Sequence, residues 1–298
     1  MHNLAKSSIA PVLGQRVPLR GPARLLYRSY AKAGCRPGDS TRRLTTKSGD
    51  EFDADLSSFL EWQLWAFGSY EWHFAELFRH LIRPADRCID VGANVGVHTT
   101  RLAKLVGVQG EVIAVEPDKE LARRARNNFL LNRLTNVRLI EAAASDCGGD
   151  SALLYRPSAR DPNKGRASLL HHRYLTGSMA VVPTVTIDDI NESPVALIKI
   201  DVEGYEAAVV QGATRTIDAY SPSIIFEYAP ELLHGKLRSP FGWLREKGYE
   251  LFRIRHARHG LTGRGSLELE CMQALPDKGT NILAISTSMA PRVSSMVR

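Results

Sequence analysis

Short apolar runs alternate with segments of helical periodicity in the first half of the chain. Three runs predict strands, and two of them end in glycine or a Glu-Pro pair: RCIDVG (87–92), EVIAVEP (111–117) and NVRLIEAAAS (136–145). The segments between them, VHTTRLAKLV (97–106) and DKELARRARNNFLLN (118–132), place apolar residues three and four apart. This β-α-β-α-β order predicts an α/β protein with a doubly wound parallel sheet.

The rhythm breaks at residues 149–186, which we expect to form a partly β excursion over the active site. It then resumes with predicted strands ALIKIDVEG, PSIIFEY, YELFRIR and NILAI and with predicted helices YEAAVVQGATRTIDAY and SPFGWLREKG. Residues 56–84 predict N-terminal helices interrupted near Gly68. We therefore expect a domain over 51–287, followed by a loose tail at 288–298.

The positive charge of the chain lies almost entirely at its start. Residues 1–50 hold ten Lys or Arg and two acids, and the remaining residues have a net charge of −1. We expect a basic N-terminal arm over 1–50, suited to peripheral contact with a membrane surface, and a cytoplasmic location. The neutral body gives no support for binding nucleic acid. No stretch approaches the roughly 20 apolar residues that span a bilayer. The four cysteines form no CxxC pair, which argues against a zinc site or a disulfide framework.

The first chemical motif joins a glycine-rich turn to a carboxylate one strand away. DVGANVG places Gly92, Asn94 and Gly96 between a strand and a helix, where glycines allow close backbone approach to a ligand. Glu116 ends the next strand, where a carboxylate can accept hydrogen bonds from ribose hydroxyls. Together these features predict a nucleoside cofactor.

The same turn discriminates between two cofactors. A dinucleotide fingerprint would be GxGxxG, and here Asn94 replaces the second glycine while Asp90 adds a negative charge. An acidic turn suits a cationic ligand with an amino-acid end better than it suits a pyrophosphate. We therefore favour S-adenosyl-L-methionine over NAD.

The second chemical motif is IKIDVEGYE, at the end of the fourth main strand. Ligands of doubly wound sheets bind beyond the carboxyl ends of the strands, and alternation puts Asp201 and Glu203 on one side. Glu227 ends the next strand, PSIIFEY. Methylation of an alcohol needs a proton acceptor, and these three carboxylates are our candidates, with His98 as a further one. Three carboxylates also suit a divalent ion, although we assign no metal.

These motifs in this order resemble the FkbM family of S-adenosylmethionine-dependent methyltransferases, from about Cys88 to Tyr228. The resemblance implies a class I methyltransferase fold, a Rossmann-like, mostly parallel seven-stranded sheet with helices on both faces. It also implies strand order 3-2-1-4-5-7-6 with the last strand antiparallel, and O-methylation of hydroxyls. Residues 1–55 lie outside it.

Carried over by position, the resemblance assigns cofactor contacts to the first motif and to the AAASD segment. Gly92, Asn94 and Gly96 line the methionine side, Asp90 orients its amino group, and Glu116 binds the ribose. The AAASD segment places Ala144, Ser145 and Asp146 near the adenine, and Asp201 of the second motif faces the reacting centre.

The function we favour is transfer of a methyl group to a hydroxyl of a sugar, glycolipid or other small-molecule acceptor. Two alternatives stay open. An NAD-dependent oxidoreductase would use a similar sheet, but it predicts GxGxxG and gives Asp90 no role. A non-catalytic binder of an adenosyl ligand would bind the cofactor without turnover.

Overall fold

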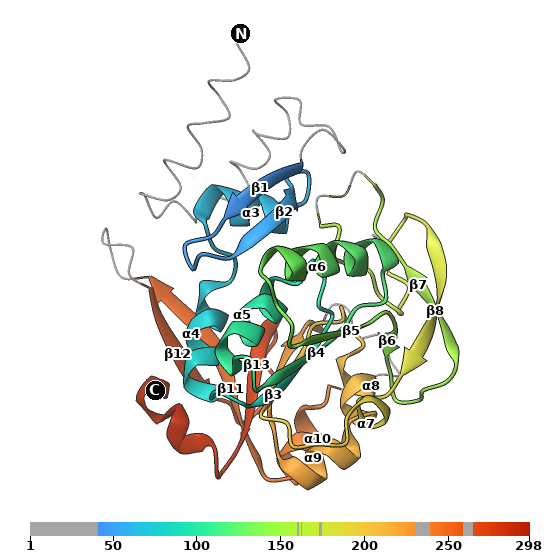
Figure 1. The fold of residues 1–298 in the computed structure, drawn as a ribbon. Helices are drawn as coiled ribbons and strands as arrows, with labels where there is room; N and C mark the ends of the chain where they lie inside the picture. Colours follow the sequence, from blue (N-terminus) through green and yellow to red (C-terminus); the bar gives the residue numbers. More distant parts are fainter. Residues whose placement is uncertain (1–40, 160, 162, 173–174, 231–238, 259–264) are drawn as a thin grey trace.

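The computed structural model describes residues 41–298 except 160, 162, 173–174, 231–238 and 259–264 (Figure 1). Most of the expected basic arm therefore lies outside the described residues. Within the described part of the chain, no helix is long and apolar enough to cross a membrane.

A large central sheet positions everything else. Its strand order is β12-β11-β13-β10-β9-β3-β4-β5. The strands are β3 (Arg87–Val91), β4 (Glu111–Val115), β5 (Val137–Ile140), β9 (Leu197–Ile200), β10 (Ser223–Tyr228), β11 (Tyr249–Arg258), β12 (Gly265–Cys271) and β13 (Thr280–Ser286). The five strands from β5 to β10 are parallel, and β13 runs antiparallel to both β10 and β11.

The predicted order 3-2-1-4-5-7-6 is confirmed, and the sheet has one strand more than predicted. The extra strand is β12, which pairs antiparallel with β11 at the edge of the sheet. The seven-stranded count was too low because SLELEC alternates apolar and acidic residues. An edge strand of that kind buries one face only, so it lacks the apolar run that marks the inner strands.

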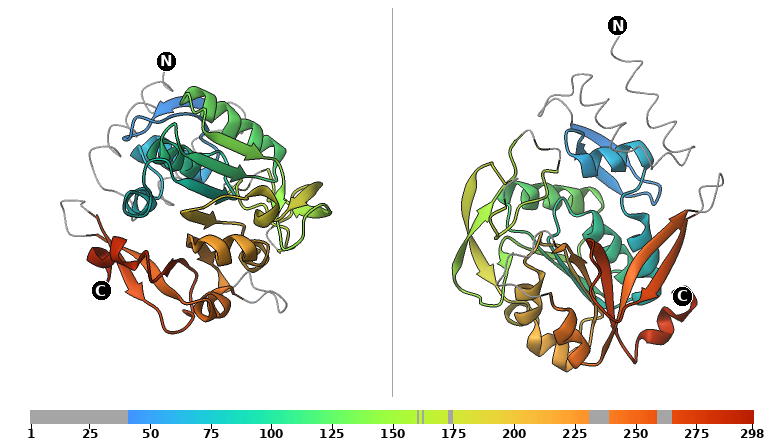
Figure 2. Two further views of the ribbon diagram at one scale, coloured as in Figure 1. Left: turned by 60° about the horizontal axis from the view of Figure 1, so that its bottom comes forward. Right: turned by 180° about the vertical axis from the view of Figure 1, so that it is seen from behind.

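Helices cover both faces of the sheet, as the ribbon shows (Figure 1, Figure 2). One face packs on α4 (Trp72–Leu81) and α5 (Val97–Val106). The other packs on α8 (Glu206–Gln211), α9 (Thr214–Tyr220) and α10 (Phe241–Glu246). In the described residues, the remaining α-helices are α3 (Phe59–Phe67), α6 (Lys119–Leu131) and the short α7 (Ile187–Ile190). Neighbouring residues on one strand serve opposite faces, with Cys88 in one core and Ile89 in the other.

A hairpin stands ahead of the N-terminal helices. Its strands are β1 (Thr41–Thr45) and β2 (Glu51–Asp55), which pair antiparallel from Thr41–Asp55 to Thr45–Glu51. The pairing crosses the boundary that we expected at residue 50, so ordered structure begins before it. α3 ends at Gly68, whose φ of 67° is left-handed. The predicted interruption near Gly68 is therefore confirmed.

The excursion contributes β7 (Ser151–Tyr155) and β8 (Met179–Val185) to a small sheet in the order β6-β8-β7. Its third strand, β6 (Ala143–Ala144), comes from the strand predicted over 136–145, which the structure divides into β5 and β6. This small sheet stands beside the central sheet (Figure 1).

The C-terminal segment is packed, so the predicted loose tail is wrong. It forms two short 3-10 helices, η2 (Ala290–Arg292) and η3 (Ser294–Met296). Val293 between them has no exposed surface and belongs to the core under α4 and α5. The Arg292 guanidinium donates to the Leu81 carbonyl at 2.7 Å. The sequence misled us because one buried side chain gives no periodic signal.

Candidate functional site

The glycine-rich turn after β3 is shaped by close backbone approach. Gly92 has φ 78°, and a Cβ there would lie 1.9 Å from the Asp201 carbonyl oxygen. Gly96, the residue before α5, has φ 84°, and its Cβ would lie 2.4 Å from the Phe129 ring. Glycine is thus required at both positions. Gly92 and Asn94 line a cavity of about 270 Å³ at the carboxyl ends of the strands, whereas Gly96 is not part of the described wall.

Glu116 holds this turn from the end of β4. Its Oε2 accepts the Asn94 N–H at 2.7 Å and its Oε1 accepts the Asp118 N–H at 2.9 Å. The structure therefore brings Glu116 and the turn together at the cavity, as the sequence predicted. Burial raises the pKa of the Glu116 carboxyl to about 7.

Asp90 and Lys199 face each other across β3 and β9, where they are register partners. Asp90 is fully buried, and its Oδ2 accepts the Thr99 hydroxyl at 2.6 Å. The Lys199 Nζ lies 3.5 Å from Asp90 Oδ1 and 3.3 Å from Asp201 Oδ2. Burial alone would lower the pKa of Lys199, but the two carboxylates raise it above its ordinary value. Asp90 thus lies behind the cavity wall, and its partners here are Thr99 and Lys199.

Carboxylates from two strand ends meet at the other side of the cavity. Asp201 and Glu203 follow β9, and Glu227 lies on β10; all three line the cavity. Asp201 is the most open, with 42% of its side chain exposed. Glu203 has a left-handed φ of 53°, and its carboxylate lies 3.9 Å from the Arg166 guanidinium.

Glu206 has a different part in the same segment. Its Oε1 accepts the N–H groups of Val202 and Gly204 at 3.3 and 3.1 Å. It therefore fixes the turn that presents Asp201 and Glu203. No group of three or more His, Cys, Asp or Glu side chains in the described residues has the arrangement of a metal site.

Glu227 has a strongly raised pKa among the carboxylates of this cluster. Burial, followed by the charges of Asp201 and Glu203, raises its pKa to about 9. At neutral pH the Glu227 carboxyl is therefore mainly protonated, and it can donate a hydrogen bond where the other carboxylates accept.

Glu227→Gln should become more stable relative to the wild type as the pH rises. A carboxyl with an ordinary pKa of 4.5 and a folded pKa of about 9 binds more protons in the folded state, so its contribution to stability falls across that window. Gln does not titrate, so the variant does not lose this contribution to stability as the pH rises. Thermal unfolding at pH 5, 7 and 9 measures it, with the exposed Glu246→Gln as the control. A constant difference between Glu227→Gln and the wild type would contradict the assignment.

One of the three residues that the resemblance places near the adenine lies in the cavity wall. It is Ala144, which lines the cavity together with Ala143. Ser145 is buried and donates to Asp146 Oδ1 at 2.9 Å, and Asp146 is exposed. Neither Ser145 nor Asp146 belongs to the described cavity wall. Their contact with an adenine remains a prediction.

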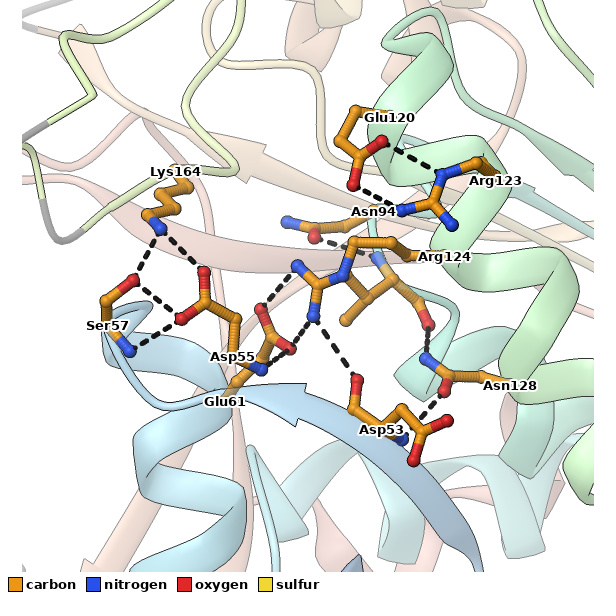
Figure 3. A network of polar contacts seen from close by, with 11 residues as sticks. Asp53, Asp55, Ser57, Glu61, Asn94, Glu120, Arg123, Arg124, Asn128 and Lys164 are labelled. Atoms are coloured by element: carbon orange, nitrogen blue, oxygen red, sulfur yellow. Dashed lines mark hydrogen bonds and ion pairs between the residues drawn. The ribbon is translucent and has the colours of Figure 1, made fainter. Parts of the chain in front are cut away.

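The excursion lines the cavity with residues 163–169 and is tied to the N-terminal hairpin by Lys164 (Figure 3). The Lys164 Nζ donates to Asp55 Oδ2 at 2.6 Å. Gly165 packs so tightly on Asn94 that a Cβ at Gly165 would lie 2.0 Å from the side-chain nitrogen Nδ2 of Asn94. Figure 3 also shows the buried Arg124–Glu61 ion pair, which joins α6 to α3.

Sequence analysis missed the turn between α3 and α4. Tyr70 and Glu71 from this turn line the cavity beside His98. The Glu71 carboxylate lies 2.9 Å from His98 Nε2. One wall of the cavity thus comes from the turn between α3 and α4 and not from the ends of the strands.

This fold and site define a class of protein. A sheet of this order, with a glycine turn after its first strand and a carboxylate after its second, is that of the class I S-adenosylmethionine-dependent methyltransferases. The family model described as the methyltransferase FkbM domain matches residues 90–251, more than half of the chain. The chain belongs to this family. S-adenosylmethionine is therefore its cofactor by class, and the cavity wall holds both Gly92 of the turn and the Glu116 carboxylate, which suits a ligand with ribose hydroxyls.

The curated relatives match less of the chain. A protein-L-isoaspartate O-methyltransferase from Ignicoccus hospitalis is 33% identical over 78 residues, which is 26% of this chain and 34% of that protein. The chain thus spans about a third of the length of the curated relatives it matches. Two solved structures are similar at low identity. The methyltransferase FkbM from Methylobacillus flagellatus is 14% identical, with 78% of this chain and 56% of that chain covered and a TM-score of 0.41. The O-methyltransferase from Thermotoga maritima is 15% identical, with 84% and 78% covered and a TM-score of 0.42. The family assignment rests on the family model.

Proposed function

We propose that the protein transfers the methyl group of S-adenosylmethionine to a hydroxyl of a sugar, glycolipid or other small-molecule acceptor. One observation carries this proposal: the glycine turn and Glu116 lie at one side of a single cavity, and carboxylates lie at the other. Glu116 and Glu227 end strands separated by two others, β3 and β9. Three strand spacings amount to about 14 Å, room for a cofactor and an acceptor side by side.

The chain's own residues have distinct parts in this reaction. Glu116 accepts hydrogen bonds from the ribose, and the turn from Gly92 to Gly96 lies along the methionine side. Bound S-adenosylmethionine supplies an activated methyl group on a sulfonium. Asp201, Glu203 and Glu227 bind and orient the acceptor hydroxyl, and such alignment supplies much of the rate acceleration.

The charge of the cavity supports an uncharged or cationic acceptor. Its wall carries Glu71, Asp201 and Glu203, and its cations are each paired with an acid: Lys164 with Asp55, Arg166 with Glu203, and Lys199 with Asp90 and Asp201. The described wall therefore leaves no unpaired cation for a phosphate, which disfavours nucleic acid as a partner. Membrane contact through the basic arm and a cytoplasmic location remain predictions, since residues 1–40 lie outside the described residues.

The test of this function identifies the product. Tritiated-methyl S-adenosylmethionine and the purified chain are added to a fractionated lysate of a strain that lacks the gene. We expect label in a sugar- or lipid-containing fraction. The labelled bond should withstand mild alkali, because an ether survives conditions that hydrolyse a methyl ester. Alkali-labile label would indicate carboxyl methylation. Calorimetry with S-adenosylhomocysteine and NADH separates this function from the oxidoreductase alternative.

Glu116→Ala should weaken S-adenosylhomocysteine binding by about 1–3 kcal/mol, because two ribose hydroxyls lose a charged acceptor. The variant also frees the Asn94 N–H, which Glu116 holds at 2.7 Å. Calorimetry measures the affinity, and Glu120→Ala on the exposed face of α6 is the matched control. An unchanged affinity would remove Glu116 from the ribose site.

A further inference from the structure

The turn between α3 and α4 reaches the cavity from outside the segment that the family model matches. It holds Tyr70 and Glu71, whereas the match begins at residue 90. Its position is fixed from α5, since the Arg101 guanidinium donates to the Tyr70 carbonyl at 2.6 Å. The family motifs therefore assign no role to these residues.

Glu71 occupies a strained backbone position. It precedes α4 with φ 41° and ψ 56°, which is left-handed, and its side chain makes no capping hydrogen bond. A non-glycine residue held in such a region costs about 1–3 kcal/mol, and such residues cluster at active sites. A carboxylate at this position would ordinarily cap the helix. Here it is directed to His98 instead.

His98 holds the Glu71 carboxylate in place. Its imidazole is buried and meets the edges of Phe74 and Phe78, with ring centroids 5.3 and 5.9 Å away. Burial, followed by the charges of Lys199 and Arg101, lowers the pKa of His98 well below 6.5. A neutral imidazole can donate only one N–H. With this proton on Nε2, the imidazole donates to the ionised Glu71 carboxylate across the 2.9 Å contact.

We propose that Glu71 accepts the proton of the acceptor hydroxyl, with His98 as the residue that positions its carboxylate. This inference rests on the proposed O-methyl transfer. As the acceptor oxygen forms its bond to the methyl carbon, the bond between carbon and sulfur breaks and its electron pair neutralises the sulfonium. The hydroxyl proton moves to the Glu71 carboxylate. Atoms and charge balance without a further reactant.

The other carboxylates of the cavity are already engaged or protonated. Asp201 is paired with Lys199, and the Glu203 carboxylate lies 3.9 Å from the Arg166 guanidinium. Burial, followed by the charge of Asp201, raises the pKa of Glu71 to about 7, whereas that of Glu227 is raised to about 9. A proton acceptor works best when its pKa lies near the working pH. Glu71 meets this condition at neutral pH.

A pH-dependent test must consider every titratable or charged group that faces Glu71. They come from its own turn, from α4, from α5 and from the ends of β9 and β10: Tyr70, His73, His98, Arg101, Lys199, Asp201 and Glu227.

The experiment compares two cofactor analogues and needs no acceptor. Sinefungin carries an amino group where S-adenosylmethionine carries its methyl group, and S-adenosylhomocysteine has no group there. Calorimetry from pH 5.5 to 8.5 gives the ratio of the two affinities for the full chain. For the wild type, we expect the affinity for sinefungin relative to that for S-adenosylhomocysteine to rise as the pH passes 7, because the Glu71 carboxylate then becomes ionised and attracts the amino group of sinefungin. Glu71→Gln should reduce sinefungin affinity by about tenfold and remove this rise, with S-adenosylhomocysteine affinity kept within about twofold.

Three further variants make the outcome decisive. Glu76→Gln, on the exposed face of α4, should behave as the wild type. Glu71→Asp should keep the rise in the affinity ratio with pH. His98→Phe should move the rise in the affinity ratio to higher pH, because the ionised Glu71 carboxylate loses a hydrogen bond. This variant tests the inference even if Glu71→Gln does not fold. An intact rise in Glu71→Gln, or an unmoved rise in His98→Phe, would overturn the inference alone. Failure of the wild type to bind either analogue would overturn the proposed function, and the inference with it.

Discussion

Lys199→Met is expected to destabilise the fold by about 3–5 kcal/mol, because it leaves a buried carboxylate without its cation. Lys199 has 2% exposure and lies 3.5 Å from Asp90 Oδ1. Asp90 has no exposure, and its Oδ1 has no hydrogen bond from the described residues. Thr99 would be its one remaining polar partner there. Urea unfolding followed by circular dichroism measures the loss.

Two controls separate charge from packing. Asp90→Asn combined with Lys199→Met removes both charges and should recover much of the lost stability, because no unpaired charge then remains. Lys247→Met breaks an exposed pair with Asp218 and should change stability by less than about 1 kcal/mol. A Lys199→Met variant as stable as the wild type would mean that the ion pair does not hold the centre of the sheet.

The inner strands could be predicted from the sequence because a strand that is buried on both faces consists mainly of apolar residues. β3 and β4 are flanked by strands and covered by helices, so their residues form apolar runs. The strand order followed from resemblance to a family, since periodicity alone does not say which strands are neighbours. The site residues at strand ends followed from topology: parallel strands bring Glu116, Asp201 and Glu227 to one edge of the sheet.

What could not be predicted depends on tertiary contacts between distant segments. β1 and β2 are short and mostly polar, and β2 is held to α6 by side-chain amides such as Asn128, which accepts the Asp53 N–H. Glu71 was missed for the same reason. Its turn reaches the cavity through the Arg101–Tyr70 contact, and nothing in the local sequence YEWHF announces a polar site.

Asp201→Asn should lower methyl transfer by about 10²–10⁴-fold and leave cofactor affinity nearly unchanged. Asn has a similar shape, and the Asp201 side chain is 42% exposed, so the fold should persist. The variant loses the negative charge that we propose orients the acceptor hydroxyl beside the transferred methyl group. Calorimetry with S-adenosylhomocysteine gives cofactor affinity, and tritium transfer to the labelled fraction gives turnover. The exposed Asp277→Asn is the matched control.

The pH profile of the residual activity separates Asp201 from Glu71. If Asp201 orients the acceptor while Glu71 takes its proton, Asp201→Asn lowers the rate at every pH and keeps the rise, but moves it to lower pH, because the Asp201 charge helps to raise the pKa of Glu71. Glu71→Gln should instead remove that rise. Near-normal turnover in Asp201→Asn would move its role to Glu203 or Glu227, the other carboxylates on the same wall. Loss of the rise in Asp201→Asn would make Asp201 itself the proton acceptor. The two variants together therefore assign binding and proton transfer to different carboxylates.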